Sequence, residues 1–129
     1  MGVFLLLTAC ATGTVRQAGP VKINPASIAA NPGPLDGREV EVVGLVVWES
    51  DRAALYQSYG TYCRGGDKLA ISVDWSTWPG VTRADNRRMV IVRGTFHNQT
   101  GAAGPGPLQP GAVVRWLSAA KPACPKALP

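Results

Sequence analysis

The chain has 129 residues, which suits one domain, and with 46% hydrophobic against 16% charged residues it is not a disordered acidic or basic tail. Glycine (15) and proline (11) together make up about a fifth of it, which excludes a mainly helical bundle, and no apolar run is long enough to span a bilayer as a helix. The formal net charge of +5 favours anionic partners, but the basic residues are scattered and fit a solvated surface better than a nucleic-acid patch.

The first ten residues predict an export signal. Residues 2–7 are apolar, and the small residues Thr8 and Ala9 precede Cys10. The run Leu7-Thr8-Ala9-Cys10 resembles the lipobox of bacterial lipoproteins, in which the signal peptide is cut before the cysteine and the cysteine is acylated. The resemblance implies that residues 1–9 are a signal peptide, truncated because no Lys or Arg precedes Arg16, and that Cys10 carries the lipid. The alternative is a buried N-terminal strand with an ordinary cysteine.

The anchor sets the expected location. Each buried methylene of an acyl chain contributes ~0.8 kcal/mol, so two or three chains make release from the membrane very slow. By resemblance to Gram-negative lipoproteins, Ala11 in place of an Asp after the cysteine implies transfer to the outer membrane, where the protein faces the periplasm. Residues 10–24 show no hydrophobic period, and we predict a lipidated cysteine followed by a flexible tether.

The folded domain is expected to span residues 25–129. Asn24 as N-cap and Pro25 at the first helical position predict a short helix over residues 25–30. Five predicted strands follow, separated by glycine-rich turns, over residues 38–48, 53–58, 69–75, 88–97 and 112–119. In the third strand, alternation directs four side chains inward: Leu69, Ile71, Val73 and Trp75.

An internal repeat supports a curved sheet. The pattern Arg38-x-Val40-x-Val42-x-Gly44 recurs fifty positions later as Arg88-x-Val90-x-Val92-x-Gly94. Two long strands with glycine at the same point suit a small barrel, whose strands must bend sharply. Five strands with a long first and a long fourth predict an all-β fold, a five-stranded OB-like Greek-key barrel with a short N-terminal helix; a small β-sandwich is the alternative.

Three segments also resemble a set of small uncharacterised bacterial envelope proteins. Those proteins carry a DGK-V-V-G strand, an LY-S segment and a V-V-G-TF strand, matched here by residues 35–44, 54–58 and 90–96. The resemblance covers about residues 35–114 and implies an OB-like fold without implying an activity. Relatives often have Gly-His-x-Gly after the third segment, where this chain has Gly101-Ala102-Ala103-Gly104.

The cysteines divide into one and two. With Cys10 acylated, Cys63 and Cys124 remain, and an even remainder in an oxidising compartment predicts a disulfide. It would close a loop of about 62 residues, worth about 4 kcal/mol in the chain-entropy model. A reactive thiol or metal pair is the alternative, but no His or Cys lies at ligand spacing, so we expect no metal and no cofactor.

No residue pattern predicts a catalytic site. His97 is the single histidine and has no marked nucleophile or acid beside it, while Glu49 and Asp51 flank a turn. Phosphate-binding, dinucleotide and zinc-protease motifs do not occur. We expect a non-enzymatic binding or interaction role; a small hydrolase would instead place His97 in a cleft against an Asp or Glu.

Aromatic residues supply the candidate binding site. OB-folds bind strands or sugars on faces of aromatic and basic side chains. Trp78 precedes a proline-glycine turn and is the best exposed candidate; the alternative places Trp48, Trp75 and Trp116 in the core. The predicted ligand-binding residues are Trp78, Trp75, Tyr59, Tyr62, Arg64 and Arg83. The expected partner is an envelope protein or polymer; a polyanion, oligonucleotide or oligosaccharide binder is the alternative, and its polyanion form would use Arg83, Arg87, Arg88 and Arg93.

Overall fold

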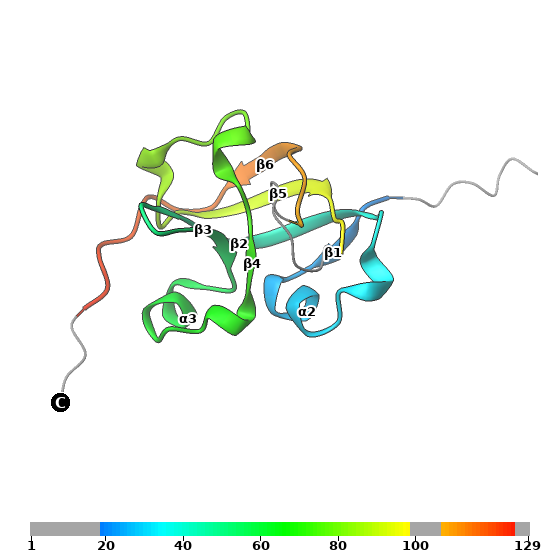
Figure 1. Ribbon diagram of the computed structural model, residues 1–129. Coiled ribbons are helices and arrows are strands. Elements are labelled where there is room, and N and C mark those ends of the chain that lie inside the picture. Colours follow the sequence, from blue (N-terminus) through cyan, green and yellow to red (C-terminus); the bar gives the residue numbers. More distant parts are fainter. Residues whose placement is uncertain (1–18, 99–106, 126–129) are drawn as a thin grey trace, which may run out of the picture.

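The computed structural model describes residues 19–98 and 107–125, which form a curved sheet of six strands with short helices along it (Figure 1). The strands are β1 (Val21–Ile23), β2 (Glu39–Glu49), β3 (Arg52–Tyr56), β4 (Ala70–Ser72), β5 (Met89–Thr95) and β6 (Ala112–Trp116). Between them lie the α-helices α2 (Pro25–Ala30) and α3 (Tyr59–Cys63), and the 3₁₀ turns η1 (Gly33–Leu35), η2 (Asp67–Leu69), η3 (Trp75–Thr77) and η4 (Arg83–Asp85). The prediction of an all-β fold is confirmed.

The strand order is β4-β3-β2-β5-β6, and β1 pairs in parallel with the first half of β2. Residues 39–45 of β2 pair antiparallel with β5, and residues 45–49 pair antiparallel with β3, so β2 belongs to both halves of the sheet. The five predicted strands are present, and β1 is a sixth. Within the described ranges β4 and β6 are end strands that do not pair with each other, so closure of the predicted barrel stays a prediction.

The sequence repeat pairs with itself in space. The two copies run antiparallel about a centre at Val42 and Val92. Each glycine therefore lies opposite a valine of the other copy: Gly44 opposite Val90, and Gly94 opposite Val40. The pairing has a local two-fold symmetry that puts these valines on one face, where they form the centre of the core.

Both glycines of the repeat are points of close approach. A Cβ on Gly44 would lie 2.7 Å from the backbone oxygen of Tyr56 and 2.7 Å from Cγ of Leu55. A Cβ on Gly94 would lie 2.5 Å from the backbone oxygen of Gln109. Glycine is required at both positions because the backbone of another segment, β3 at Gly44 and Gln109 at Gly94, occupies the space that a side chain would need.

The main core lies inside the curve of the sheet. Its buried members come from the strands, from α2 and from the turns that close the concave face, and they are Ile28, Leu35, Val40, Val42, Val46, Leu55, Ile71, Val73, Trp75, Trp78, Val81, Val90, Val92, Phe96 and Leu108. A smaller cluster on the opposite face of β2 contains Leu45, Val47, Ala54 and Tyr56. Residues 45–47 are therefore buried on both faces of the sheet, as their unbroken apolar run predicts.

The N-terminal helix is as predicted, but the tether is shorter. The Asn24 side chain accepts a hydrogen bond from the backbone N–H of Ser27 at 2.8 Å, and Pro25 is the first residue of α2. Residues 21–23, expected in the tether over 10–24, instead form β1 on residues 40–42. A segment of three residues is too short to show the alternation of a strand in its sequence. It becomes a strand only because the fold places β2 beside it. In the part of the chain that the structure describes, no helix has the length and apolar character to cross a membrane.

The third predicted strand is shorter than residues 69–75. Leu69 belongs to η2 and is 42% exposed, which corrects its predicted inward position. After β4 the chain turns at Asp74, whose side chain caps η3. Val73 and Trp75 are nevertheless buried, because the 3₁₀ turn directs the indole to the same core as the strand.

We expect Gly44→Ala to destabilise the fold by about 1–3 kcal/mol, because the new methyl group meets the backbone oxygen of Tyr56 in β3 as well as the buried side chain of Leu55. Gly33→Ala is the matched control, since nothing lies within 4 Å of its Cβ position and its φ is not positive. Urea denaturation of both variants measures the difference. Equal midpoints would contradict the role of Gly44.

Candidate functional site

The aromatic platform predicted from Trp75 and Trp78 is wrong, because both indoles lie in the core. Trp75 is 0% and Trp78 is 3% exposed. The Nε1 of Trp75 donates hydrogen bonds to the backbone oxygens of Val47 (3.1 Å) and Ala54 (3.0 Å). The two ring centroids are 5.5 Å apart. The proline-glycine turn after Trp78 is exposed, but η3 turns the indole inward before that point.

The two predicted tyrosines are half-buried and hold other segments of the protein. The Tyr59 hydroxyl donates to the backbone oxygen of Pro122 at 2.9 Å. The Tyr62 hydroxyl donates to Oε2 of Glu49. Both belong to α3, whereas Arg83 lies in η4, so the described residues do not form the contiguous aromatic and basic patch that was predicted.

Arginines of the predicted polyanion surface have partners inside the molecule. Three of them form ion pairs: Arg87 with Glu49 (3.8 Å), Arg88 with Asp85 (2.9 Å) and Arg93 with Glu41 (2.9 Å). Two lie over indole rings: Arg83 over Trp48 (5.0 Å to the ring centroid) and Arg88 over Trp116 (4.2 Å). Arg64 caps the end of α3 and is exposed. The internal partners neutralise or cover much of the charge that a polyanion would need.

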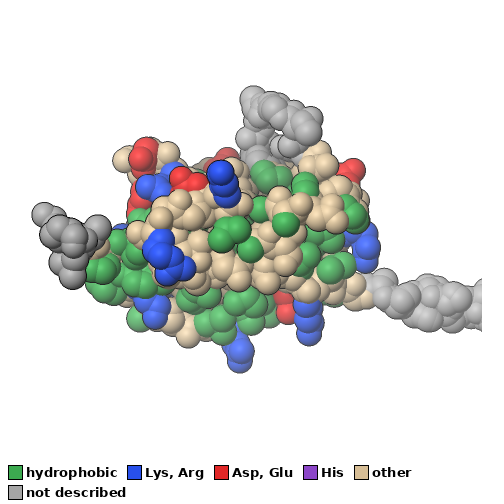
Figure 2. Space-filling view, turned by 90° about the horizontal axis from the view of Figure 1, so that it is seen from below, with side chains coloured by type: hydrophobic (Ala, Val, Ile, Leu, Met, Phe, Trp, Pro, Cys, Tyr) green, Lys and Arg blue, Asp and Glu red, His purple; other side chains and the backbone are tan. Residues whose placement is uncertain are grey.

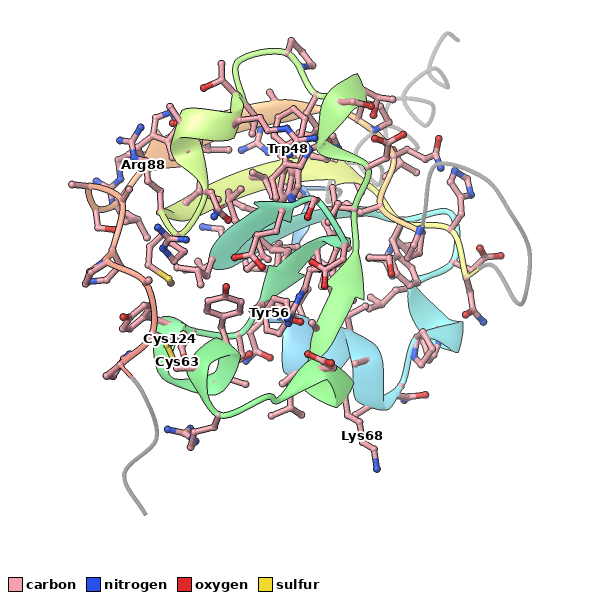
Figure 3. All side chains as sticks on the ribbon, turned by 60° about the vertical axis from the view of Figure 1, so that its left-hand side comes forward. Trp48, Tyr56, Cys63, Lys68, Arg88 and Cys124 are labelled. Atoms are coloured by element: carbon pink, nitrogen blue, oxygen red, sulfur yellow. A yellow bond between two sulfur atoms is a disulfide. The ribbon has the colours of Figure 1, made fainter. Side chains whose placement is uncertain are left out.

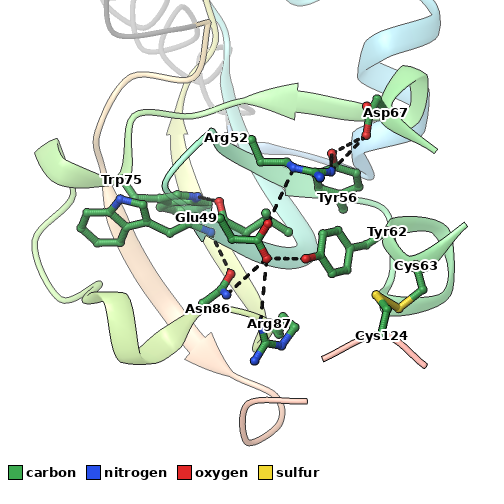
Figure 4. Close-up of polar contacts among 12 residues, drawn as sticks. Glu49, Arg52, Tyr56, Tyr62, Cys63, Asp67, Trp75, Asn86, Arg87 and Cys124 are labelled. Carbon is green, nitrogen blue, oxygen red and sulfur yellow. Dashed lines mark hydrogen bonds and ion pairs between the residues drawn. A yellow bond between two sulfur atoms is a disulfide. The ribbon is translucent and has the colours of Figure 1, made fainter. Parts of the chain in front are cut away.

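A polar cluster that the sequence did not predict surrounds Glu49 (Figure 4). The β2–β3 turn places Glu49 opposite Arg52, whose Nε lies 3.7 Å from Oε1 of the carboxylate. Oε2 accepts the Tyr62 hydrogen bond and lies 3.5 Å from Asn86 Nδ2 and 3.8 Å from Arg87 Nη1. One carboxylate therefore joins β2, β3, α3 and the segment before β5.

Arg52 connects this cluster to a groove beside β3 and β4. Its Nη1 donates to the Tyr56 hydroxyl at 3.0 Å and lies 3.5 Å from Oδ1 of Asp67, which also accepts a hydrogen bond from Tyr56 at 2.5 Å. The groove has a volume of about 480 Å³, and its lining residues are Asp51, Arg52, Ala53, Ala54, Tyr56, Asp67, Ala70, Ile71 and Ser72. This β3–β4 groove thus combines two carboxylates and a guanidinium with small apolar side chains.

The phenols of this region are neutral hydrogen-bond donors at physiological pH. Burial and the bond to Glu49 raise the pKa of Tyr62 to about 12. Burial and the bond to Asp67 raise the pKa of Tyr56, against the lowering effect of Arg52. The hydrogen bond to Tyr56 raises the pKa of Arg52. Neither phenol is therefore poised as a general base or a nucleophile, and each donates its proton to a carboxylate of the protein.

The predicted disulfide between Cys63 and Cys124 is present, with the two Cα atoms 5.4 Å apart. It joins the end of α3 to the C-terminal segment (Figure 3). The same segment accepts the Tyr59 hydrogen bond, and the backbone N–H of Lys121 donates to the carbonyl of Arg87 at 2.8 Å. The C-terminal segment is therefore fixed to α3 at one point and to the start of β5 at another.

Arg87 stands in a strained conformation between these parts. Its φ is +69°, a region that costs an L-residue about 1–2 kcal/mol. Its backbone N–H donates to the carbonyl of Val46 at 2.7 Å, and its Nε donates to the carbonyl of Lys121 at 2.8 Å. Contacts from β2 and from the C-terminal segment thus stabilise the strained backbone, which directs the guanidinium to Glu49.

The remaining predicted positions have simple surroundings. His97 is exposed at the end of β5, and within the described ranges no carboxylate accepts a hydrogen bond from its imidazole. Asp51 is exposed in the β2–β3 turn. No group of three or more His, Cys, Asp and Glu that could hold a metal ion occurs among the described residues. Cys10 and Gly101-Ala102-Ala103-Gly104 lie outside them.

One part of the Glu49 cluster had a signal in the sequence. Glu49-x-x-Arg52 across a turn between two strands places the two charges directly opposite each other. The tyrosine and asparagine partners come from distant segments, so no local pattern indicates them.

No protein-family model, curated protein or solved structure matches this chain. The resemblances described for the sequence therefore stay predictions, and function is inferred from the residues and their geometry.

The disulfide should carry much of the stability of the C-terminal segment. It links residues 61 positions apart, and we expect the double variant Cys63→Ser/Cys124→Ser to lose about 2–4 kcal/mol of unfolding free energy. Tyr59→Phe, which removes only exposed hydrogen bonds to the same segment, should lose about 1 kcal/mol or less. Thermal and urea unfolding measure both. Two free thiols in the wild-type protein purified without reductant, seen by intact mass, would contradict the pairing.

The raised pKa of Tyr62 predicts a loss of stability at alkaline pH. The Tyr62 hydroxyl holds its proton more tightly in the folded protein than in the unfolded chain. Its contribution to the free energy of unfolding is therefore fully present below pH 10 and is lost as the pH rises through about 12. Urea denaturation between these values should show a flatter decline for Tyr62→Phe than for the wild type. Identical slopes in the two proteins would refute the assignment.

Proposed function

We propose that this protein is a membrane-anchored lipoprotein of the bacterial envelope with a non-enzymatic binding or interaction role. The observation that carries the proposal is the distribution of the three cysteines. Cys63 and Cys124 pair with each other, which leaves Cys10, the cysteine of the lipobox-like run, without a cysteine partner in the chain. A disulfide suits an oxidising compartment, and an acylated cysteine suits the membrane that borders it.

The β3–β4 groove supports a binding role. It offers charges of both signs, a neutral phenol and small apolar side chains within about 480 Å³. Such a lining recognises a ligand that has both cationic and anionic groups, as a short peptide or the peptide part of an envelope polymer does. The charged groups are positioned by one another: Arg52 lies between Glu49 and Asp67.

The alternative, a polyanion or oligosaccharide module, has weaker support. The internal partners of Arg83, Arg87, Arg88 and Arg93 reduce the charge for a polyanion, and the burial of Trp75 and Trp78 removes two predicted stacking surfaces for a sugar. Placement at the outer membrane, facing the periplasm, follows from Ala11 after the cysteine and forms part of the proposal.

The anchor is tested by metabolic labelling with a fatty acid in a Gram-negative host, with the protein expressed from its own locus so that any upstream residues are included. We expect the wild type to carry label and to sediment with outer membranes, and Cys10→Ser to lose the label completely. Cys63→Ser/Cys124→Ser is the matched control and should keep its label. An unlabelled wild-type chain that still begins with Met1 and remains in the soluble fraction would overturn the proposal.

A further inference from the structure

The face of the sheet that points away from the main core is covered over only part of its area. We call it the outer face. Around the second half of β2 it is covered, and Leu45 and Val47 are fully buried there by the smaller cluster that includes Tyr59 and Tyr62 of α3. Around the first half the cover ends, and Val43 is 40% exposed. An apolar surface that is continuous with a buried cluster therefore reaches solvent.

The strand register makes this exposed surface continuous across three strands. Val43 of β2 lies opposite Ile91 of β5, and Ile91 lies opposite Arg115 of β6. Val114 is the extra residue of the bulge beside Arg115 and is 45% exposed. Leu117, whose backbone N–H bonds the Met89 carbonyl, extends the same face and is 41% exposed. The outer apolar stripe consists of Val43, Met89, Ile91, Val114 and Leu117.

The charges around the outer apolar stripe favour an anionic partner. Arg115 stands within it, is exposed and makes no ion pair among the described residues. In the next row of the same face, Arg93 is paired with Glu41, and Lys22 of β1 lies beside Glu41 and is exposed. The other acidic residues of these strands are Glu39 and Glu49, at the two ends of β2, and Glu49 is already engaged by Tyr62 and two arginines. In the view of Figure 2, most of the visible Asp and Glu lie along the upper edge, whereas Lys and Arg lie along both edges and project from the lower one beside hydrophobic side chains.

The kind of surface also limits the kind of partner. The backbone groups of β2 and β5 are engaged in their sheet ladders, so the face itself offers only side chains, and among the strands that carry the stripe backbone hydrogen bonds remain for a peptide only along the outer edge of β6. It offers aliphatic side chains and long cations whose stems can lie along apolar surface while their charged ends reach phosphate. A lipid surface needs no directed hydrogen bonds from its partner.

We propose that the outer apolar stripe and Arg115 dock this domain flat onto an anionic phospholipid bilayer. The proposal rests on the proposed function for the anchor that brings the domain to the membrane. Residues 11–20 separate Cys10 from β1, and ten residues reach at most about 36 Å even when fully extended. The chain enters the sheet at β1, whose Lys22 is part of the same face. A basic apolar surface held this close provides the second signal that strengthens acyl anchoring.

The docking surface is tested apart from the anchor by vesicle sedimentation of the full chain. All chains carry Cys10→Ser, Leu5→Asp and Leu6→Asp, so neither acylation nor the apolar residues 2–7 contribute. The vesicles are phosphatidylcholine alone or phosphatidylcholine mixed with phosphatidylglycerol, at low salt. We expect the background protein to bind the mixed vesicles better, and Val114→Asp to weaken that binding about tenfold.

Leu69→Asp is the matched control. It makes the same chemical change at a residue of equal exposure, 42%, in η2, away from the outer face, and it should bind within about twofold of the background protein. In a second pair, Arg115→Ala should weaken binding to the mixed vesicles about fivefold, whereas Arg64→Ala should leave it unchanged. Thermal unfolding checks that each variant is folded, and Val43→Asp replaces Val114→Asp if that variant is not.

Three outcomes would overturn the docking proposal. Equal weakening by Val114→Asp and Leu69→Asp would show binding by net charge alone, as for a soluble polyanion. Equal binding to both kinds of vesicle would remove the role of the anionic lipid. No binding of the background protein would leave the stripe to a protein partner. None of these results depends on acylation, so the anchor and the docking surface can fail separately.

Discussion

Burial of β2 on both faces is the constraint on which the rest of this structure depends. Its first half lies between β1 and β5 and its second half meets β3, and Leu45 is the residue that pairs on both sides. The strand is apolar on both faces at residues 45–47, so each face needs its own cover. The curl of the sheet around the main core covers one face, and α3 and the C-terminal segment flank the other. Glycine at position 44 is what lets β3 approach closely enough for this arrangement.

The elements that cover the outer face of β2, α3 and the C-terminal segment, are held in place mainly by hydrogen bonds, ion pairs and the disulfide. The Glu49 carboxylate joins four segments at the edge of that cover, and the Cys63–Cys124 disulfide fixes the last of the chain to a helix of five residues. A short helix and a segment without regular structure bury too little surface to hold themselves in place in a small domain. The dependence on a disulfide agrees with a protein that works outside the reducing cytoplasm. The same face, where this cover ends, presents the stripe for which we propose a membrane.

The tryptophans show why a count of aromatic residues was a poor guide to the binding site. A domain of this size closes its core with a few large side chains, and Trp75 and Trp78 fill the open side of the curved sheet. The other two tryptophans are partly buried against the same core and are covered from outside by Arg83 and Arg88. Two arginines that suggested a polyanion surface thus lie over tryptophans at the rim of the core, and the tryptophans that suggested a ligand platform are buried inside it. The candidate site, the β3–β4 groove, is smaller and more polar than the predicted aromatic platform, and Tyr56 contributes a hydroxyl group to it.

The sequence by itself determined the elements with local causes. The Asn24 cap and Pro25 define the helix, valine-rich runs bounded by turns define the two long strands, and the repeat around Gly44 and Gly94 indicates that these strands are of the same kind. The disulfide was predicted from the count of cysteines and from the expectation of an oxidising compartment. Only the tertiary structure decided that residues 21–23 are a strand, that Trp78 faces inward, and that Glu49 collects partners from three other segments. Local patterns fix which conformation a segment prefers, but burial and ion pairing depend on which distant segments come to lie beside it, and that is set by the register of β2 with its neighbours.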